Sequence, residues 1–330
     1  MRIDNLLQVT DGMLQNIPSV GHIESIKIDP LKVQRGDLFI DIKNSLQNQA
    51  VAYENGAYVI ISENISQIID NEIAWIEVDS LRLCAVKLAR YEFSKKNGKI
   101  LFLGDVEQEI LHSIAKNSEF IKLSSNVYKT LITIKQSGEN CNFTCSDERL
   151  AFSIDPSSAA LKVCNGINIF MSNSPFFSSF VFDSVYYQDI AIPNIFVKKV
   201  CSVISFLSSN HIEYSLKNIS LKKHFSPKFV DFKLQKREFG QSSKVLVFER
   251  DIDLIDLEIK YLQKFTNELL VCIPKKYSKY ISFDNFISFV NNIDLIDTLR
   301  QNFRYALILG DKSLYKELFL PQASKQASLF

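Results

Sequence analysis

Along the first half of the chain, hydrophobic positions recur with the two-residue period of a strand in some segments and with the 3.6-residue period of a helix in others. This alternation of segments is typical of an α/β protein. Short apolar or alternating runs predict strands at 22–29, 38–42, 58–62, 73–79 and 100–103. Helical spacing predicts helices at 48–57, 80–98 and 106–116. Ser80 can cap the start of the helix at 80–98 and Gly98 can cap its end, while Gly56 suits a left-handed turn after the first helix.

The second half of the chain continues with a β-rich stretch and then a regular alternation. Short β-prone segments predict strands at 127–136, 141–146, 149–155 and within 166–187, and Pro193 can begin a helix at 192–212. Strands are then expected at 244–249, 268–274 and 305–310, and helices at 253–265, 282–293 and 312–319. Strands that alternate with helices predict a parallel, doubly wound sheet. The last residues, 320–330, are expected to be loose.

Composition narrows the class of protein further. The 330 residues suffice for two or three domains, and the net charge of +1 gives no broad field for nucleic acid. No apolar run is long enough for a membrane span, the N-terminal residues lack a secretory signal, and the six cysteines are scattered as expected of buried thiols. Cys141 and Cys145 have no matching pair for zinc. We therefore expect a cytoplasmic protein with no metal site.

One stretch, "KILFLGDVEQEILHSIA" at 99–115, has the layout of a phosphate-binding loop without its chemistry. An apolar run reaches Gly104 and a helical pattern follows at once, as in many nucleotide sites. The turn, however, carries Asp105, Glu107 and Glu109 and no lysine. Carboxylates suit a helix N-terminus but repel phosphate.

The segment "SIKIDPLKVQRGDLFIDIKNSLQNQAVAYENGAYVIISE" at 25–63 carries a family pattern. The matching positions are Asp29, Val33, Gly36, Asp37, Leu38 and Phe39, followed by Ala50, Ala52, Gly56 and Ala57. This pattern resembles the N-terminal domain of the Mur ligases, closest to the D-alanyl-D-alanine-adding (MurF) type. These enzymes join amino acids or dipeptides to the UDP-muramoyl peptide precursor of peptidoglycan.

The resemblance implies a three-part α/β scaffold that is shorter than that of full-length family members. It places an N-terminal Mur-ligase-like domain at 1–98, a reduced central domain, the former ATPase, at 99–224, and a C-terminal Rossmann-like domain at 225–330. The helix near 192–212 resembles a family helix whose asparagine is kept as Asn194. The missing length falls in the central domain.

The family's ATP loop would fall at residues 100–111. Gly104 keeps the first glycine, whereas Glu107 takes the place of the second glycine, Gln108 that of the lysine and Glu109 that of the first Ser/Thr. The backbone cradle, the phosphate-neutralising cation and the magnesium ligand would all be lost. We therefore expect no ATP and no other cofactor, with the carboxylates capping the helix instead.

The uridine diphosphate site is also altered. The Ser and Arg that lie by the diphosphate in the family are replaced here by Pro30 and Leu31, so both donors are lost. Lys32 and Arg35 lie close enough in sequence to substitute for them. With Asn194, they are the candidate substrate-binding residues.

The sequence therefore favours a degenerate Mur-ligase homologue without ATP chemistry, a pseudoenzyme with a binding or scaffolding role in cell-wall or cell-shape biogenesis. Its expected partners are cell-wall enzymes or a UDP-muramoyl precursor, and the oligomeric state is open. The alternative is a divergent UDP-N-acetylmuramoyl-tripeptide–D-alanyl-D-alanine-type ligase that retains activity, with Asp105, Glu107, Glu109 and His112 as catalytic candidates. A third possibility is a protein-interaction module without a small ligand.

Overall fold

The computed structural model describes residues 1–116 and 120–319, which form two compact units. One unit comprises Met1–Asp105 and Ser118–Leu161, and the other comprises Val106–Asn117 and Lys162–Phe330. The expected loose tail at 320–330 lies outside the described residues. The three-part division at residues 98 and 224 stays a prediction.

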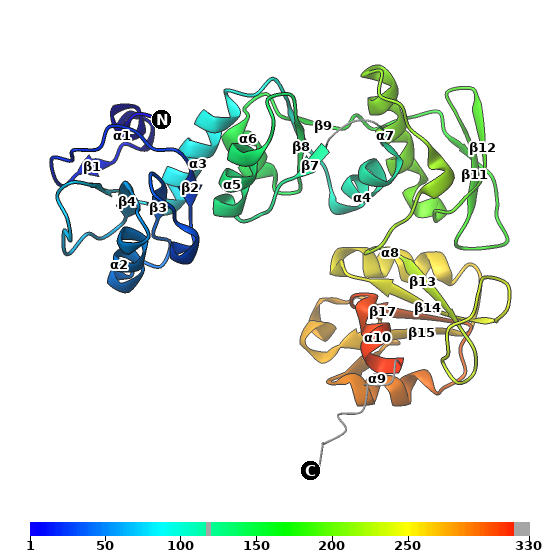
Figure 1. Cartoon of the computed structure of the whole chain (residues 1–330). Coiled ribbons are helices and arrows are strands. Elements are labelled where there is room, and N and C mark those ends of the chain that lie inside the picture. The colour runs from blue at the N-terminus through cyan, green and yellow to red at the C-terminus, as the bar shows by residue number, and fades with distance from the viewer. Residues whose placement is uncertain (117–119, 320–330) are drawn as a thin grey trace, which may run out of the picture. The chain divides into compact units, whose positions relative to one another are not determined.

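The first unit begins with a mostly parallel sheet (Figure 1). Its strands are, in spatial order, β1 (Met13–Leu14), β5 (Ala74–Glu77), β4 (Val59–Ser62), β3 (Leu38–Ile40) and β2 (Ile26–Lys27). Neighbouring strands from β5 to β2 run parallel, and only the edge strand β1 is antiparallel. The buried strands were predicted at the correct places, although β2 is shorter than the expected strand at 22–29.

Helices cover both faces of this sheet. The helices are α1 (Ile3–Thr10), α2 (Leu46–Glu54) and α3 (Leu81–Phe93). Trp75 lies in one apolar cluster with Ala52 of α2, whereas its neighbour Ile76 lies in the opposite cluster with Leu88 of α3. This alternation follows from the two-residue period of a strand and explains why both faces are apolar.

A second parallel sheet completes the first unit. Its strands are β7 (Phe120–Lys122), β8 (Asn142–Cys145), β6 (Ile100–Phe102) and β9 (Ala159–Ala160), and its helices are α5 (Val127–Gln136) and α6 (Glu148–Ile154). Helix α3 contacts both α5 and α6, and the rings of Phe93 and Phe143 meet edge-on at 6.0 Å. The two sheets therefore share one apolar core.

The strands expected at 127–136 and 149–155 were wrong, because both segments are helices. β-Branched residues at 127–136 favour a strand locally, but Val127, Leu131 and Ile134 are buried at helical spacing. Asn126 and Asp147 cap α5 and α6 by accepting hydrogen bonds from backbone N–H groups two to three residues into each helix. Burial of a helical stripe and a polar cap thus outweigh the β propensity.

Gly98 does not cap α3, as the sequence had suggested. The helix ends at Phe93 with Ser94 as its C-cap, while Ser80 does accept a hydrogen bond from Leu83 N at the start. A Cβ on Gly98 would lie 1.7 Å from the carbonyl oxygen of Cys141. Gly98 is therefore required where two backbone segments approach closely.

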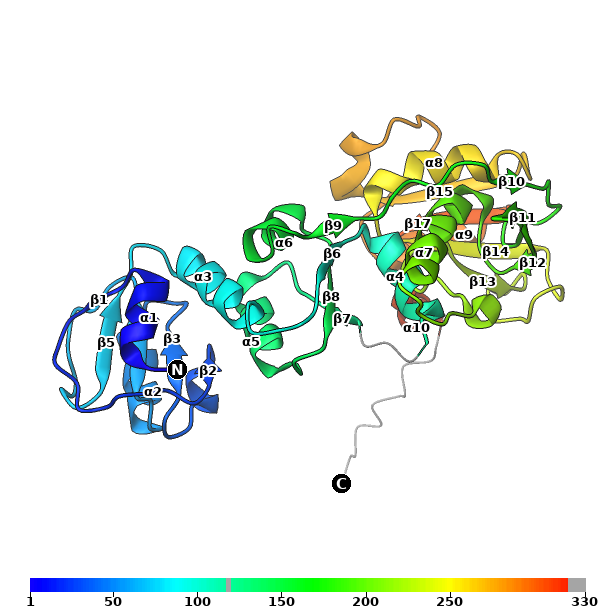
Figure 2. The ribbon, with the colours of Figure 1, turned by 90° about the horizontal axis from the view of Figure 1, so that it is seen from above.

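The second unit contains helices, a small antiparallel sheet and a larger mixed sheet (Figures 1 and 2). The first elements are α4 (Asp105–Ile114), β10 (Asn168–Ile169), β11 (Ser178–Phe182), β12 (Val185–Ile190), the 3-10 turns η2 (Asn194–Phe196) and η3 (Leu216–Asn218), and α7 (Val197–Ser209). The β-strands within 166–187 and the helix after Pro193 are as predicted. Helices α4 and α7 lie side by side in both views.

The larger sheet belongs to the C-terminal region, where the predicted alternation is confirmed. Its strands are, in spatial order, β13 (Ser226–Val230), β14 (Lys244–Glu249), β17 (Tyr305–Leu309), β15 (Leu269–Pro274) and β16 (Ile287–Phe289). All neighbours are parallel except the edge strand β13. Helix α8 (Ile252–Leu262) lies on one face, and α9 (Asn292–Leu299) and α10 (Ser313–Phe319) lie on the other (Figure 1).

The helix expected at 282–293 was wrong. Residues 287–289 form β16, which pairs with β15, and α9 begins only after Asn291. The side chain of Asn291 accepts hydrogen bonds from Ile293 N at 2.9 Å and from Asp294 N at 3.0 Å. An N-cap at this position excludes a helix that runs through it.

A pair of buried carboxyl groups lies where β14 ends. Glu249 and Glu258 are both 0% exposed. Glu249 accepts hydrogen bonds from Phe225 N at 3.0 Å and Asp251 N at 2.6 Å, and His224 Nδ1 lies 2.8 Å from it. Burial, and then the charge of Glu249, raise the pKa of Glu258 well above its usual value, so that Glu258 is the member that stays protonated.

We predict that Glu258→Gln stabilises the protein increasingly as pH rises. The unfolded carboxyl ionises near pH ~4.3, whereas the folded one holds its proton to a higher pH. Each pH unit between the two pKa values therefore costs the native protein about 1.4 kcal/mol. The amide mimics the protonated acid, so its advantage in melting temperature should grow from pH 5 to pH 8. The exposed Glu268→Gln is the control, and a pH-independent difference would contradict the prediction.

Candidate functional site

The strand, glycine and helix at 99–115 form as the sequence predicts. Strand β6 ends at Phe102, Gly104 is exposed, and α4 begins at Asp105. Gln108, at the position of the family's lysine, is 0% exposed. Its side chain therefore points into the protein and presents nothing to a phosphate at the helix start.

The carboxylates of α4 have partners of their own. The Glu107 carboxylate contacts the amine of Lys199 on α7. Glu109 Oε2 accepts hydrogen bonds from two consecutive backbone amides, Lys222 N at 2.9 Å and Lys223 N at 3.2 Å. Asp105 pairs with Lys122 of β7 at 3.1 Å, with both side chains partly exposed. The acidic turn is therefore occupied by structural contacts.

Strand β6 pairs with β8 and β9 in the first unit, to which Asp105 also belongs. From Val106 onward α4 belongs to the second unit, and so do the partners of Glu107 and Glu109.

His112 is exposed on α4 and shares a side of the helix with Asp105 and Glu109. These three residues are spaced four and three apart, which aligns them on one stripe. Glu107 points roughly 160° away from Asp105 by helical geometry. The side chains of the four catalytic candidates therefore do not point to one common site, because Glu107 faces the other side of the helix.

Lys32 and Arg35 occupy different surroundings in the first unit. Asp29 Oδ1 accepts a hydrogen bond from Leu31 N at 3.1 Å at the start of the turn η1 (Pro30–Lys32), and Lys32 Nζ lies 3.8 Å from Asp29 Oδ2. Arg35 Nε donates to Tyr58 Oη at 3.2 Å, and this contact raises the pKa of the guanidinium. Leu31, in place of the family's arginine, is 78% exposed.

A pocket of about 580 Å³ lies beside Lys32. Lys27 of β2 and Lys129 of α5 line it together with Lys32 and Asp29. The sequence did not single out Lys27 or Lys129, which lie about one hundred residues apart and meet only through the fold. Three lysines thus line the pocket next to the position where the resemblance places the diphosphate, and Lys27 Nζ also lies 3.9 Å from Asp37 Oδ2.

Asn194 lines a separate pocket of about 640 Å³ in the second unit, with Lys264, Phe265 and Arg304. Its backbone N–H donates to Tyr261 Oη at 3.2 Å. Its side-chain oxygen is buried and has no hydrogen-bond partner within the described part of the chain. Burial raises the pKa of Tyr261 to about 12, so this phenol stays a neutral donor, and it donates to Pro175 O at 3.1 Å.

Residues 1–116 and 120–319 contain neither a metal-binding cluster nor a membrane-spanning helix. That part of the chain holds no group of three or more His, Cys, Asp or Glu side chains arranged for a metal ion. None of its helices combines the length and the apolar character needed to cross a bilayer. The cytoplasmic location stays a prediction.

The sequence comparisons found no match for this chain, whereas solved structures share its fold. No protein-family model matches the sequence, and no curated protein does. A solved MurF from Acinetobacter baumannii matches with a TM-score of 0.60 and 13% identity, over 95% of this chain and 96% of its own. MurF ligase from Thermotoga maritima, solved in complex with ADP, matches with a TM-score of 0.62 and 14% identity, over 89% and 96%.

A further Acinetobacter baumannii structure, of UDP-N-acetylmuramoylalanyl-D-glutamyl-2,6-diaminopimelate–D-alanyl-D-alanyl ligase, matches with a TM-score of 0.57 and 13% identity. Each match spans nearly the whole of the solved protein, so the likeness extends over the full architecture and not over one domain. The mixed α/β chain described above therefore has the fold of the MurF-type Mur ligases.

Proposed function

We propose that this chain is a Mur-ligase-like protein that acts by binding, without ATP chemistry, in peptidoglycan or cell-shape biogenesis. The observation that carries the proposal is the acidic first turn of α4. Glu107 and Glu109 are engaged by Lys199 and by two backbone amides, and Gln108 is buried. The link to the cell wall rests on the fold shared with MurF ligases.

Electrostatics supports the loss of ATP chemistry. A carboxylate about 4 Å from a phosphate charge is repelled by roughly 4 kcal/mol at an effective dielectric constant near 20. The lysines that contact the turn are already paired, Lys199 with Glu107 and Lys122 with Asp105. The phosphates of a nucleotide would therefore meet the carboxylates of this turn, and neither of these paired lysines would be free to offset the repulsion.

The second candidate is a divergent ligase of the D-alanyl-D-alanine-adding type. It is favoured by the pocket lined by Lys27, Lys32 and Lys129, which offers positive charge for an anionic precursor. Both candidates can use this pocket, because binding a UDP-muramoyl precursor does not itself require ATP. ATP consumption distinguishes them.

We predict that ATP neither binds nor is consumed. Millimolar Mg-ATP should leave the melting temperature unchanged, since only a ligand that binds the native state raises it. No ADP should form with UDP-N-acetylmuramoyl tripeptide and D-alanyl-D-alanine, while the Thermotoga maritima MurF assayed in parallel provides the positive control. Precursor-dependent ADP formation would refute the proposal and establish the ligase.

We predict that the double variant Glu107→Gln/Glu109→Gln loses stability. It removes the partner of Lys199 and weakens the acceptor of Lys222 N and Lys223 N. The free energy of unfolding in urea should fall by about 1–3 kcal/mol. Glu148→Gln, which changes an exposed glutamate in the first turn of α6, is the matched control. Unchanged stability together with loss of a measured turnover would instead assign the two residues to catalysis.

We predict that UDP-N-acetylmuramoyl tripeptide binds in the pocket of Lys27, Lys32 and Lys129. Lys129→Met should weaken binding about tenfold in calorimetry, because one charge-assisted contact is worth about 1.5 kcal/mol. Lys129 is exposed on α5, so the fold should tolerate the change, and the exposed Lys99→Met is the control. Equal affinities of the wild type and both variants would place the precursor elsewhere.

A further inference from the structure

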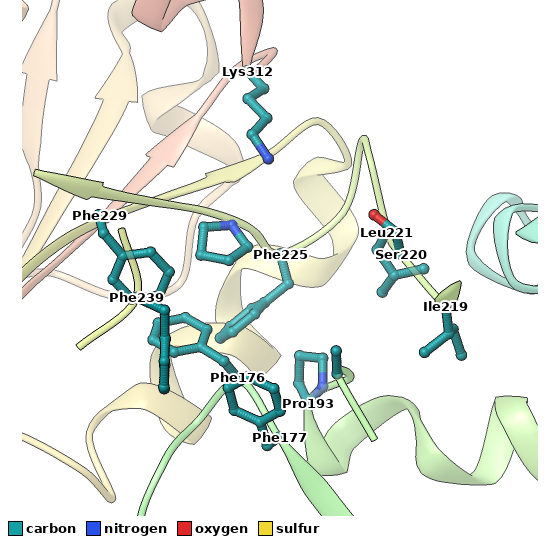
Figure 3. Close-up of a pocket in the computed structure, with 12 residues that line it drawn as sticks. Phe176, Phe177, Pro193, Ile219, Ser220, Leu221, Phe225, Phe229, Phe239 and Lys312 are labelled. Carbon is teal, nitrogen blue, oxygen red and sulfur yellow. The ribbon is translucent and has the colours of Figure 1, made fainter. Parts of the chain in front are cut away.

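The second unit contains an aromatic pocket that plays no part in the proposed function. The cavity holds about 240 Å³ (Figure 3). The residues that line it are Phe176, Phe177, Ala191, Pro193, Ile219, Ser220, Leu221, Phe225, Pro227, Phe229, Phe239 and Lys312. It is smaller than the roughly 300–1,000 Å³ of pockets for drug-sized ligands, so it suits a body of about one ring.

The walls of this aromatic pocket are held by contacts between their own rings. The ring of Phe176 lies 5.6 Å from that of Phe229, and the ring of Phe229 lies 5.2 Å from that of Phe239, both nearly perpendicular. Edge-to-face pairs at such distances are favourable beyond their buried area. The cavity is therefore bounded by side chains that support one another.

Phe225 occupies a strained backbone conformation at the wall of the pocket. Its φ is 42°, in the left-handed region that a bulky side chain rarely adopts. Such a residue costs roughly 1–3 kcal/mol and persists only where surrounding contacts impose it. Here Glu249 Oε2 accepts from Phe225 N at 3.0 Å, and the side chain is 2% exposed. Backbone strain of this kind tends to cluster at ligand sites.

Lys312 is the one charged residue among those lining the pocket, and Figure 3 shows its amine reaching towards the rings. Within residues 1–116 and 120–319, no hydrogen bond or ion pair involves this amine. The adjacent Asp311 is engaged elsewhere, because its Oδ1 accepts from Ser313 N at 2.8 Å and its Oδ2 lies 3.4 Å from Arg250 Nε.

The surroundings of Lys312 disfavour the charged form of its amine. Burial lowers its pKa, and the charges of Lys228 and Lys236 lower it further. Lys236 itself pairs with Glu238 at 3.4 Å in an exposed contact. A negative group beside Lys312 would offset both the desolvation and the repulsion of its ammonium group.

We infer that this pocket binds a small monocarboxylate with an apolar body of about one ring, with the carboxylate on Lys312 and the body among the phenylalanines. A single ammonium group matches one carboxylate, whereas a phosphate would call for more donors than the pocket offers. The apolar lining supplies the burial that favours the ring. This site does not depend on the proposed function, since neither α4 nor the lysine pocket of the first unit contributes to it.

The experiment compares 3-phenylpropionate with its neutral analogue 3-phenylpropanamide on the full chain, by calorimetry or saturation-transfer NMR at pH 7. We expect the acid to bind at least tenfold more tightly than the amide. Lys312→Met should remove this preference and leave amide binding in place. Lys316→Met, an exposed lysine on α10, should keep the preference.

A second variant tests the cavity without touching the charge. Ala191 is exposed at the pocket, and Ala191→Phe should fill it and weaken both compounds. Affinity for the acid should also decline at alkaline pH as Lys312 loses its proton, while that for the amide should not change. The inference is overturned by equal binding of acid and amide to the wild type, by a preference that survives Lys312→Met, or by no binding of either compound in the millimolar range.

Discussion

Two carboxylates from distant parts of the chain hold four consecutive residues, 222–225, and the second unit depends on this clamp. Glu109 of α4 accepts from the backbone N–H groups of Lys222 and Lys223, while Glu249 of β14 accepts from Phe225 N and contacts His224. Buried backbone amides need acceptors, and carboxylates are strong ones. The clamp joins α4 to the entry of the C-terminal sheet, because β13 begins at the next residue.

Through the clamp, the acidic turn of α4 makes structural contacts with another segment of the chain. In a phosphate loop, the start of the helix keeps its donors free for an anion and a lysine adds positive charge. Here the helix supplies acceptors to other segments, and the position of the lysine is buried as Gln108. A lysine at position 108 would place an ammonium group in a fully buried position, so the surrounding packing would have to change to admit it.

The sequence predicted the elements whose signals are local and missed those decided by tertiary contacts. The run at 100–103 and the alternation at 244–310 were clear, because buried strands and amphipathic helices have distinct periods. At 127–136 the β-branched residues led to the prediction of a strand. The segment is a helix, and its apolar stripe becomes evident only from the residues that are buried. Glu107 and Glu109 were expected to cap α4, whereas they contact Lys199 and the backbone of residues 222–223, which are far away in the sequence. Lys312 carried no signal, because nothing in the sequence distinguishes it from the other lysines of the chain.

The strain at Phe225 connects the clamp to the aromatic pocket. Glu249 can hold Phe225 at a positive φ because its other contacts, to Asp251 N and His224, fix the carboxylate in place. The protonated Glu258 beside it adds no second negative charge to this buried site. The contacts of Glu249 therefore also set the ring of Phe225 against that of Phe176, 5.9 Å away. The aromatic pocket therefore shares a wall, at Phe225, with the segment that the clamp holds.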